Sequence, residues 1–344
     1  MPELRVALVG FGLAGSVFHA PLIAAEPRMR LDVVVTSSAE RAEQARQEHP
    51  GVRVLATPPE LFADPSGIDL VVIATPNRSH ASLALEAIEA GIPVVVDKPL
   101  TVTSAEAEQV IAAAEGRGVA LSVFQNRRWD GDFRTVQSLI EKGRLGEVQR
   151  FESRMERWRP VGKGGWRELG GAADGAGYLY DLGSHLVDQA LILFGPVVDV
   201  YCERDRRRAG VEADDDAFLA LTHESGVRSH LWMSAVSAQI GPRFRVLGSE
   251  SAFVIDGLDP QEADLRAGRR PGDGQSWGTV ESDRWGLLGT EGDTDRIPTE
   301  PGDYPAFYRA MAAALLDGTP VPVDPHDALE TLRILERGAM SAQR

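Results

Sequence analysis

The sequence has 344 residues, of which 43% are hydrophobic and 25% charged, so its composition excludes a fibrous or disordered chain and its length suggests two domains. It carries 36 Lys and Arg against 51 Asp and Glu, a formal charge of -15, which disfavours nucleic acid and anionic membranes as partners. The single cysteine, Cys202, cannot form an internal disulfide, and no apolar run reaches the ~18 residues of a membrane span. These features predict a cytoplasmic protein.

Residues 1–125 are predicted to form a dinucleotide-binding domain of the doubly wound α/β (Rossmann) class. Short apolar runs rich in β-branched residues alternate with helical patterns, which is typical of a parallel sheet covered on both faces. Six strands are predicted over 4–9, 31–36, 52–55, 69–74, 93–97 and 119–123. Pro21 falls inside the first helical segment and should kink or end that helix, because proline lacks a backbone donor.

Residues 126–344 are predicted to form an α+β domain for substrate binding and oligomerisation. Helical patterns cover 132–142, 179–194, 305–316 and 325–340. A long strand follows the first of these helices, and further strands are predicted over 197–202, 217–222, 227–234, 244–247 and 252–255. The short turns between these later strands favour an antiparallel meander. Residues 258–303 are rich in Gly, Asp and Pro and predict a functional, interface or partly disordered loop.

The first turn of the chain has the sequence Gly10-Phe11-Gly12-Leu13-Ala14-Gly15 and directly follows a predicted buried strand. In this position the spacing predicts a dinucleotide site. The first glycine permits a tight turn, the second lets the backbone approach a pyrophosphate, and the third lets the helix pack on the strand. The alternative interpretation is an ordinary glycine-rich connection between a strand and a helix.

The end of the second predicted strand bears on the choice of cofactor. Proteins that prefer NAD usually carry an acid here for the ribose hydroxyls, whereas this chain has Thr36-Ser37-Ser38. Asp32 comes too early in the strand to reach the ribose, and Arg41 follows where it could hold a 2′-phosphate. The pattern predicts NADP, with NAD as the alternative. Arg41 could instead be a solvated residue of the first helical turn.

Two further strand ends are predicted to meet at the ligand-binding edge of the sheet. One carries Ala74-Thr75-Pro76-Asn77, with His80 shortly after it, and the other carries Asp97-Lys98-Pro99. His80 is predicted to line the cofactor cleft. Lys98 is a candidate catalytic ammonium, because an apolar strand precedes it and a proline fixes the chain behind it. The alternative for Lys98 is an ordinary surface charge.

The second half of the chain contains a candidate acid–base pair. Asp181 and His185 are four residues apart on a predicted helix and share one face. An aspartate one turn from an imidazole can orient it and favour its charged form. The alternative is a capping aspartate and a core histidine. The basic run 204–208 is flanked by Glu203 and by the acids of 212–216, and is interpreted as a solvated turn at a strand end.

These motifs together resemble the Gfo/Idh/MocA family of oxidoreductases over the whole chain. Within the family, the chain is most similar to the NADP-dependent scyllo-inositol dehydrogenase subgroup, through residues 10–21, 126–130, 179–185 and 265–269. The resemblance implies a Rossmann domain, a C-terminal domain with a large and mainly antiparallel open sheet, and a homodimer or homotetramer assembled through that sheet. Asp97 departs from the family pattern, which normally has Glu before Lys-Pro.

The resemblance also implies hydride transfer between NADP and a secondary alcohol of a cyclic polyol or sugar. The catalytic set would be Lys98, Asp181 and His185. His185 would take the hydroxyl proton, since the pKa of histidine lies near the working pH, Lys98 would stabilise the developing charge on oxygen, and Asp181 would orient His185. No metal site is predicted. Alternatives are another sugar dehydrogenase of this family and a catalytically silent NADP-binding regulatory protein.

The substrate pocket is predicted to combine flat apolar faces with forked hydrogen-bond donors, which would suit the two sides of a ring polyol. The residues expected to line it are Asn126, Arg127, Trp129, Trp166 and Tyr178. Residues 126–129 follow the sixth predicted strand, at the edge where the nicotinamide should bind. An inositol, with scyllo-inositol first, or the corresponding inosose is the expected substrate.

Overall fold

The computed structural model describes residues 3–171, 174–274 and 276–342, apart from the side chains of 166 and 167. The chain forms two compact units, and each is assembled from segments that are distant in the sequence. The first unit holds the chain up to Asn126 together with Gln261–Trp277 and Tyr304–Leu329. The second unit holds Arg127–Pro260, Gly278–Asp303 and the chain from Glu330 onward.

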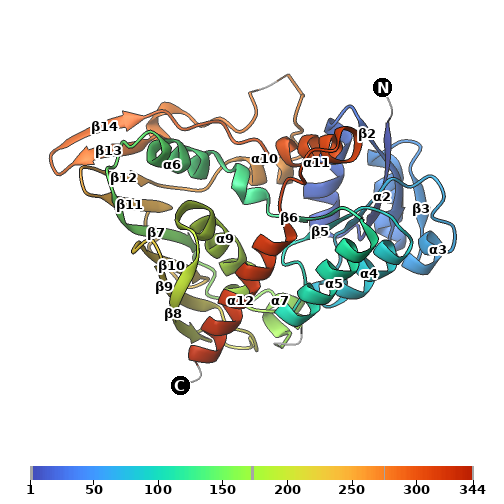
Figure 1. Ribbon diagram of the computed structural model, residues 1–344, viewed down its shortest axis with the longest axis horizontal. Coiled ribbons are helices and arrows are strands. Elements are labelled where there is room, and N and C mark those ends of the chain that lie inside the picture. The colour runs from blue at the N-terminus through green and yellow to red at the C-terminus, as the bar shows by residue number, and fades with distance from the viewer. Residues whose placement is uncertain (1–2, 172–173, 275, 343–344) are drawn as a thin grey trace. The chain divides into compact units, whose positions relative to one another are not determined.

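The first unit is built on a six-stranded parallel sheet with the strand order β3-β2-β1-β4-β5-β6, of which β2, β3, β5 and β6 are labelled in Figure 1. Its strands are β1 (Leu4–Val9), β2 (Met29–Val35), β3 (Arg53–Leu55), β4 (Leu70–Ile73), β5 (Val94–Asp97) and β6 (Leu121–Phe124). The strand order changes direction between β1 and β4, and doubly wound sheets bind ligands at the carboxyl ends of such a strand pair. The predicted Rossmann class is confirmed.

Most helices of the first unit connect these strands. The connecting helices are α1 (Ala20–Ala25), α2 (Ala39–Glu48), α3 (Pro58–Ala63), α4 (His80–Glu89) and α5 (Ser104–Arg117), and α10 (Gln261–Arg266) and α11 (Pro305–Asp317) follow later in the chain. Helix α5 begins with a capping box between Thr103 and Glu106, as its sequence indicates. Pro21 lies in the first turn of α1, where a missing donor costs nothing, and a π-helix, η1 (Ala14–His19), precedes it.

The second unit contains an eight-stranded sheet with the order β14-β13-β12-β11-β7-β10-β9-β8. Its strands are β7 (Val148–Glu156), β8 (Val197–Asp205), β9 (Asp216–His223), β10 (Arg228–Ser234), β11 (Phe244–Gly248), β12 (Ala252–Ile255), β13 (Gly286–Thr290) and β14 (Asp293–Ile297). In the described chain, β7 and β10 are parallel and the other neighbouring strands are antiparallel. The mainly antiparallel sheet is confirmed. The predicted meander is wrong at one point, because β7 lies between β10 and β11.

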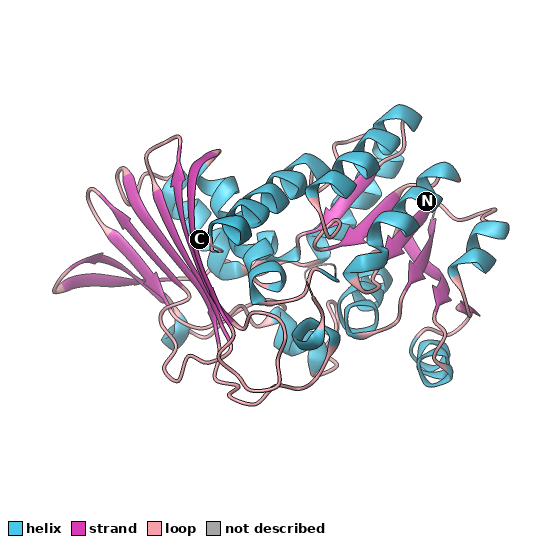
Figure 2. Ribbon diagram, turned by 90° about the horizontal axis from the view of Figure 1, so that it is seen from below, coloured by secondary structure: helices cyan, strands magenta, loops and turns pink. Residues whose placement is uncertain are grey.

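One face of this sheet carries the core of the second unit, and helices lie along it (Figure 2). The helices of the second unit are α6 (Gly131–Glu141), α7 (Trp166–Leu169), α8 (Tyr178–Asp181), α9 (Gly183–Phe194) and α12 (Pro325–Ser341). Of these, α6, α8, α9 and α12 contribute residues to this core, and α12 begins in the first unit. Strand β9 shows the alternation clearly, because Ala217, Leu219 and Leu221 are buried and the residues between them are half-exposed. Burial of each such leucine contributes about 1.5–3 kcal/mol.

The segment 258–303 has more regular structure than its composition suggested. Strand β13 pairs with β12 and β14 pairs with β13, so the two strands extend the eight-stranded sheet, and α10 joins the first unit. The prediction of a loop without regular structure is therefore wrong over these parts. In the described chain, no helix combines the length and the apolar character needed to cross a membrane.

Candidate active site

The glycine turn after β1 is shaped by close backbone approaches. Gly10 has a φ of 99°, and a Cβ there would lie 2.5 Å from the carbonyl oxygen of Ala74 at the end of β4. A Cβ at Gly15 would collide with the Gly10 carbonyl oxygen. Gly12 differs, because the nearest atom to such a Cβ is Arg41 Nη1 at 3.7 Å. Gly10 and Gly15 therefore hold the turn together, whereas Gly12 leaves a backbone surface that a ligand can approach.

The first turn of α2 places a cation beside this surface. Ser38 is the N-cap of α2, and its Oγ accepts the backbone N–H of Arg41 at 3.3 Å. Thr36 Oγ1 accepts the N–H of Ser38 at 3.4 Å, while Ser37 is exposed. The N-terminal end of a helix favours anions, and the guanidinium of Arg41 adds a full positive charge near Gly12. The three hydroxyl residues and Arg41 thus place hydrogen-bonding groups and a positive charge beside Gly12, and residues 36–38 contribute no carboxylate.

The other residues predicted to bind the cofactor in this region differ in how far their side chains are buried. Phe11 is 1% exposed, so its ring belongs to the core and only its backbone can face a ligand, while Ala14 is half-buried in η1. At the end of β4, Pro76 is exposed, and Asn77 begins the short helix η2 (Asn77–Ser79) with 8% exposure. Thr75 lies beside the glycine turn, since its Cγ2 would be 3.1 Å from a Cβ at Gly10.

His80 ties two strand ends together. Its ring is fully buried, with Nε2 3.0 Å from the carbonyl oxygen of Thr75 and Nδ1 2.8 Å from that of Pro99. Burial lowers the pKa of His80, although the charge of Asp97 and the two carbonyls act in the opposite direction. Because the ring spans the segments that follow β4 and β5, it fixes the spacing between the Thr75 loop and the residues behind Lys98.

Lys98 follows β5 and is half-buried, and Asp97 shapes the chain beside it. Asp97 Oδ1 accepts the backbone N–H of Lys98 at 2.9 Å and lies 3.8 Å from Nε2 of His19. Burial acts to raise the pKa of Asp97, but His19, Lys98 and His80 together lower it below its usual range. The carboxyl group is therefore ionised at neutral pH and can hold positive charge at this strand end.

In the second unit, Asp181 and His185 lie on two successive helices. Asp181 ends α8 and His185 lies in the first turn of α9, with the helical residue Leu182 between the two elements. The predicted single helix over 179–194 is therefore wrong at Leu182, although backbone bonds from Leu182 to Tyr178 and from Leu186 to Leu182 continue the helical path. His185 is 5% exposed, and Asp181 is half-buried.

An aspartate distant in the sequence positions α8. Asp214 Oδ2 accepts the N–H of Leu179 at 2.8 Å, and the carbonyl of Asp214 accepts that of Tyr178 at 3.0 Å, so Asp214 caps the start of this helix. Gly177 has a φ of 100°, and a Cβ there would collide with Oδ1 of Asp214. The cap and the glycine together fix where the segment that carries Asp181 begins.

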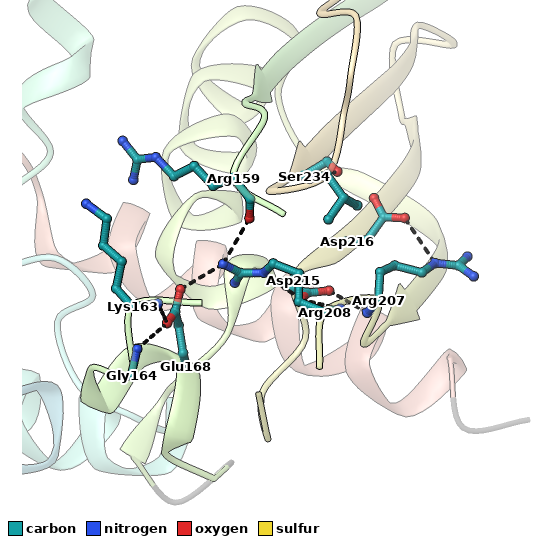
Figure 3. Close-up of polar contacts among 10 residues, drawn as sticks. Arg159, Lys163, Gly164, Glu168, Arg207, Arg208, Asp215, Asp216 and Ser234 are labelled. Carbon is teal, nitrogen blue, oxygen red and sulfur yellow. Dashed lines mark hydrogen bonds and ion pairs between the residues drawn. The ribbon is translucent and has the colours of Figure 1, made fainter. Parts of the chain in front are cut away.

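The buried side chain of Arg208 holds the loop that contains Lys163 and Gly164, through Glu168 (Figure 3). The Arg208 side chain is 2% exposed, with Nε 2.8 Å from Asp215 Oδ2 and Nη1 2.9 Å from Glu168 Oε1. Glu168 in turn accepts the backbone N–H groups of Lys163 and Gly164, and these contacts lower its pKa although burial acts to raise it. The interpretation of 204–208 as a solvated turn is therefore wrong at Arg208.

The residues predicted to line the substrate pocket have mixed surroundings. Asn126, Arg127 and Trp129 form the short helix η3 (Asn126–Trp129), and Arg127 pairs with Asp130 at 3.2 Å. Trp129 is half-buried. The ring of Tyr178 lies 5.6 and 5.7 Å from the guanidinium carbons of Arg157 and Arg208, within cation–π range. Trp166 begins α7, but its side chain lies outside the described part of the structure.

One feature of the sequence, which the interpretation of 204–208 as a solvated turn did not use, indicates that Arg208 is buried. The core-facing residues of β9 are Ala217, Leu219 and Leu221, and the same alternation, continued backwards, places Asp215 on the buried face. An acid at a core-facing position needs a buried cation or several donors. Arg208 supplies the cation, and the N–H groups of Arg207 and Arg208 supply the donors at 2.7 and 3.1 Å.

The switch point between β1 and β4, with the glycine turn beside it, defines a dinucleotide-binding protein. Residues 4–125 match a family model described as an oxidoreductase family with an NAD-binding Rossmann fold, and residues 133–254 match the GFO/IDH/MocA C-terminal domain. The chain belongs to the Gfo/Idh/MocA family of NAD(P)-binding oxidoreductases, as the resemblance in its sequence motifs indicated. The protein is thus an oxidoreductase.

Individual relatives match along nearly the full length. The chain is 42% identical to the uncharacterized oxidoreductase YdgJ of Escherichia coli, with 99% of this chain and 97% of the relative covered. It is 36% identical to scyllo-inositol 2-dehydrogenase (NADP(+)) IolW of Bacillus subtilis, with 99% and 94% covered. The solved structure of the oxidoreductase yvaA from Bacillus subtilis superposes with a TM-score of 0.93 at 35% identity, covering 99% of this chain and 97% of that chain.

Proposed function

We propose that the protein is an NADP-dependent dehydrogenase that acts on a secondary alcohol of a cyclic polyol, scyllo-inositol first, or reduces the corresponding inosose. The observation that carries the cofactor choice is the guanidinium of Arg41 beside Gly12, where the segment 36–38 supplies hydroxyls and no carboxylate. The activity that gives the Bacillus subtilis relative IolW its name supports both the cofactor and the substrate class.

The cofactor would be held by the turn Gly10–Gly15, the segment 36–41 and the ends of β4 and β5. When bound, its nicotinamide ring accepts or supplies the hydride. Gly12 offers the open backbone surface, Arg41 and the α2 N-terminus offer positive charge to a 2′-phosphate, and Asp97 offers a carboxylate near Lys98. These donor types match the groups of a phosphorylated dinucleotide.

The chemistry at the alcohol would fall to three side chains. Lys98 donates a hydrogen bond to the alcohol oxygen and stabilises the negative charge that develops there. His185 takes the hydroxyl proton in oxidation and returns it in reduction, a role that suits an imidazole. Asp181 orients His185 and accepts a neighbouring hydroxyl of the substrate. A lost proton carrier or charge-stabilising donor typically lowers kcat by about 10² or more.

The substrate would bind against the residues singled out from the sequence. Trp129 and Tyr178 offer flat faces to the C–H side of a ring, and Asn126 offers amide groups to its hydroxyls. Arg127 is already paired with Asp130, so we assign it a supporting role in holding η3 rather than a direct contact. Trp166 completes the proposed set. A simple apolar alcohol would leave these polar groups unpaired, at a cost of about 1–3 kcal/mol each.

Steady-state kinetics with NADP and NAD side by side tests the proposal. Wild type should show higher kcat/KM with NADP, and the double variant Ser37→Asp with Arg41→Ala should reverse the preference. Turnover should be highest with scyllo-inositol, lower with myo-inositol and pyranose sugars, and absent with propan-2-ol. Lys98→Ala, His185→Ala and Asp181→Asn should bind NADPH within a few-fold of wild type but lose turnover. Activity on propan-2-ol with none on any ring polyol would refute the substrate class.

We further propose that two or four copies assemble through the open face of the eight-stranded sheet, as the family resemblance implies. This face carries an aromatic stripe in which Tyr201, Phe218, His230 and Trp232 are in ring contact, with the centroids of Phe218 and Trp232 5.0 Å apart. Tyr201 is 55% exposed. Light scattering should report an oligomer for wild type and a smaller species for Trp232→Glu. A monomeric wild type would refute the assembly.

A further inference from the structure

A chain of buried polar groups stands behind the strand end that carries Lys98. His19 closes η1, Asp97 closes β5 and Tyr308 lies in α11, so three distant segments of the first unit meet here. Nδ1 of His19 is 2.6 Å from the hydroxyl of Tyr308, and Nε2 is 3.8 Å from Oδ1 of Asp97. His19 and Tyr308 are both 0% exposed. Polar groups are costly to bury unless they are hydrogen-bonded, so His19 and Tyr308 stabilise each other inside the unit.

The protonation of the two ring nitrogens of His19 follows from the groups that they face, Tyr308 at 2.6 Å and Asp97 at 3.8 Å. Asp97 is ionised and can only accept, so the nitrogen of His19 that faces it, Nε2, should carry the proton. In the neutral imidazole, Nδ1 then carries the lone pair and accepts the hydrogen bond that the Tyr308 hydroxyl donates. Burial raises the pKa of Tyr308, as does the charge of Asp97, so the phenol keeps the proton that it donates. Tyr308 therefore donates to His19, and the Nε2–H of His19 faces Asp97 across 3.8 Å, an electrostatic contact that is longer than a hydrogen bond.

The surroundings hold the imidazole in this orientation. The ring of His19 packs on that of Phe124 with centroids 4.3 Å apart, and Phe124 pairs with Asp97 in the β5–β6 register. Tyr308 packs against Phe124 as well, at 5.9 Å. Because Phe124 packs on the His19 ring and the Tyr308 hydroxyl holds Nδ1, the two ring nitrogens stay directed toward Tyr308 and Asp97.

We propose that Tyr308 and His19 are positioning residues for Lys98, and that they act through Asp97. The oxygen of Asp97 that faces His19 is also the one that accepts the backbone N–H of Lys98, at 2.9 Å. A carboxylate held from behind by His19 fixes the peptide from which the lysine side chain extends. This inference rests on the catalytic role proposed for Lys98, and it adds two residues that touch neither the substrate nor the cofactor.

The kinetic test uses Tyr308→Phe, which removes one hydroxyl, together with two changes at His19. His19→Gln can place an amide N–H near the position of Nε2, whereas His19→Leu cannot. Tyr308→Phe and His19→Leu should each lower kcat about tenfold and leave the KM for NADPH within about twofold, since a displaced catalytic group affects the chemical step. His19→Gln should recover most of the loss.

A packing control separates this role from simple stability. Phe307 lies in the same helix, with its ring 5.3 Å from that of Tyr308, and it contributes no polar group. Phe307→Leu should lower the melting temperature and keep kcat near the wild-type value. Wild-type kcat in both Tyr308→Phe and His19→Leu, or a His19→Gln variant no better than His19→Leu, would overturn the inference.

NMR of the protein without substrate or cofactor provides a readout independent of turnover. The ¹⁵N shifts of His19 should show a protonated Nε2 and an unprotonated Nδ1, and a protonated Nδ1 would contradict the proposed order of donation. The carboxyl ¹³C signal of Asp97, which also senses Lys98 and His80, should titrate at higher pH in His19→Leu. An unchanged Asp97 titration would overturn the inference.

The variant Lys98→Ala distinguishes a failure of the positioning role from a failure of the catalytic role proposed for Lys98. If it abolishes turnover while Tyr308→Phe and His19→Leu remain fully active, the positioning role fails and the proposed function stands. If Lys98→Ala itself retains wild-type turnover, both the catalytic assignment and the positioning role fail.

Discussion

Replacing Arg208 with methionine tests the buried brace of the second unit. The side chain keeps much of its length and apolar character but loses the guanidinium that contacts Asp215 and Glu168 at 2.8 and 2.9 Å. Asp215 has no exposed side-chain surface, so its carboxylate would remain buried without a cationic partner. We therefore expect a large decrease in the free energy of unfolding, and the loop that contains Lys163 should become more accessible to protease.

The remaining contacts of Asp215 and Glu168 determine how much free energy of unfolding Arg208→Met should lose. Removing one partner of a buried ion pair costs about 3–5 kcal/mol. Asp215 would keep the backbone N–H groups of residues 207 and 208, and Glu168 would keep those of 163 and 164. Glu168 is also 13% exposed, so water can replace part of the lost contact. The cost should therefore fall near the lower limit, about 3 kcal/mol, which corresponds to roughly 6–12 °C in melting temperature for a unit of this size.

The neighbouring Arg207 provides a matched control. It pairs with Asp205 at 2.6 Å and Asp216 at 3.4 Å, but its side chain is 56% exposed, and exposed ion pairs are worth about 0–1 kcal/mol. Thermal unfolding followed by circular dichroism should show little change for Arg207→Met. Trypsin cleavage after Lys163, followed by mass spectrometry, should accelerate only in Arg208→Met. Equal melting temperatures for the two variants would refute the role assigned to burial.

Two further predictions concern the glycine turn and a buried histidine. Gly12→Ala should keep the wild-type melting temperature but weaken NADPH binding measured by fluorescence, because its Cβ meets only Arg41 at 3.7 Å; Gly15→Ala should instead lower the melting temperature, because its Cβ collides with the Gly10 carbonyl. Burial lowers the pKa of His223 from 6.5, so the unfolded chain binds more protons and the free energy of unfolding falls as the pH drops below that value. His223→Gln should make this fall shallower between about pH 7.5 and pH 5.5, and an unchanged slope would contradict it.

The sequence by itself determined the first sheet and its glycine turn, because both depend on local rules. A buried parallel strand needs a continuous apolar run, and Gly10 needs a conformation with positive φ that a glycine adopts without strain. The positions of Lys98 and of the segment 74–77 at strand ends follow from the same runs. Pro21, which the sequence suggested would kink or end the first helix, instead lies in the first turn of α1, and the helix continues to Ala25.

The tertiary structure alone decided which distant residues became partners. His19 and Tyr308 are 289 positions apart, and nothing in either neighbourhood of the sequence indicates the other. Strand β7 pairs with β10 and β11, and β13 and β14 extend the sheet from a segment whose composition suggested a loop. Arg208 is buried because it pairs with Asp215, which continues the alternation that places every second residue of β9 in the core. Periodicity in a sequence reports that a side chain is buried, whereas the identity of the group that it meets depends on how the whole chain folds back on itself.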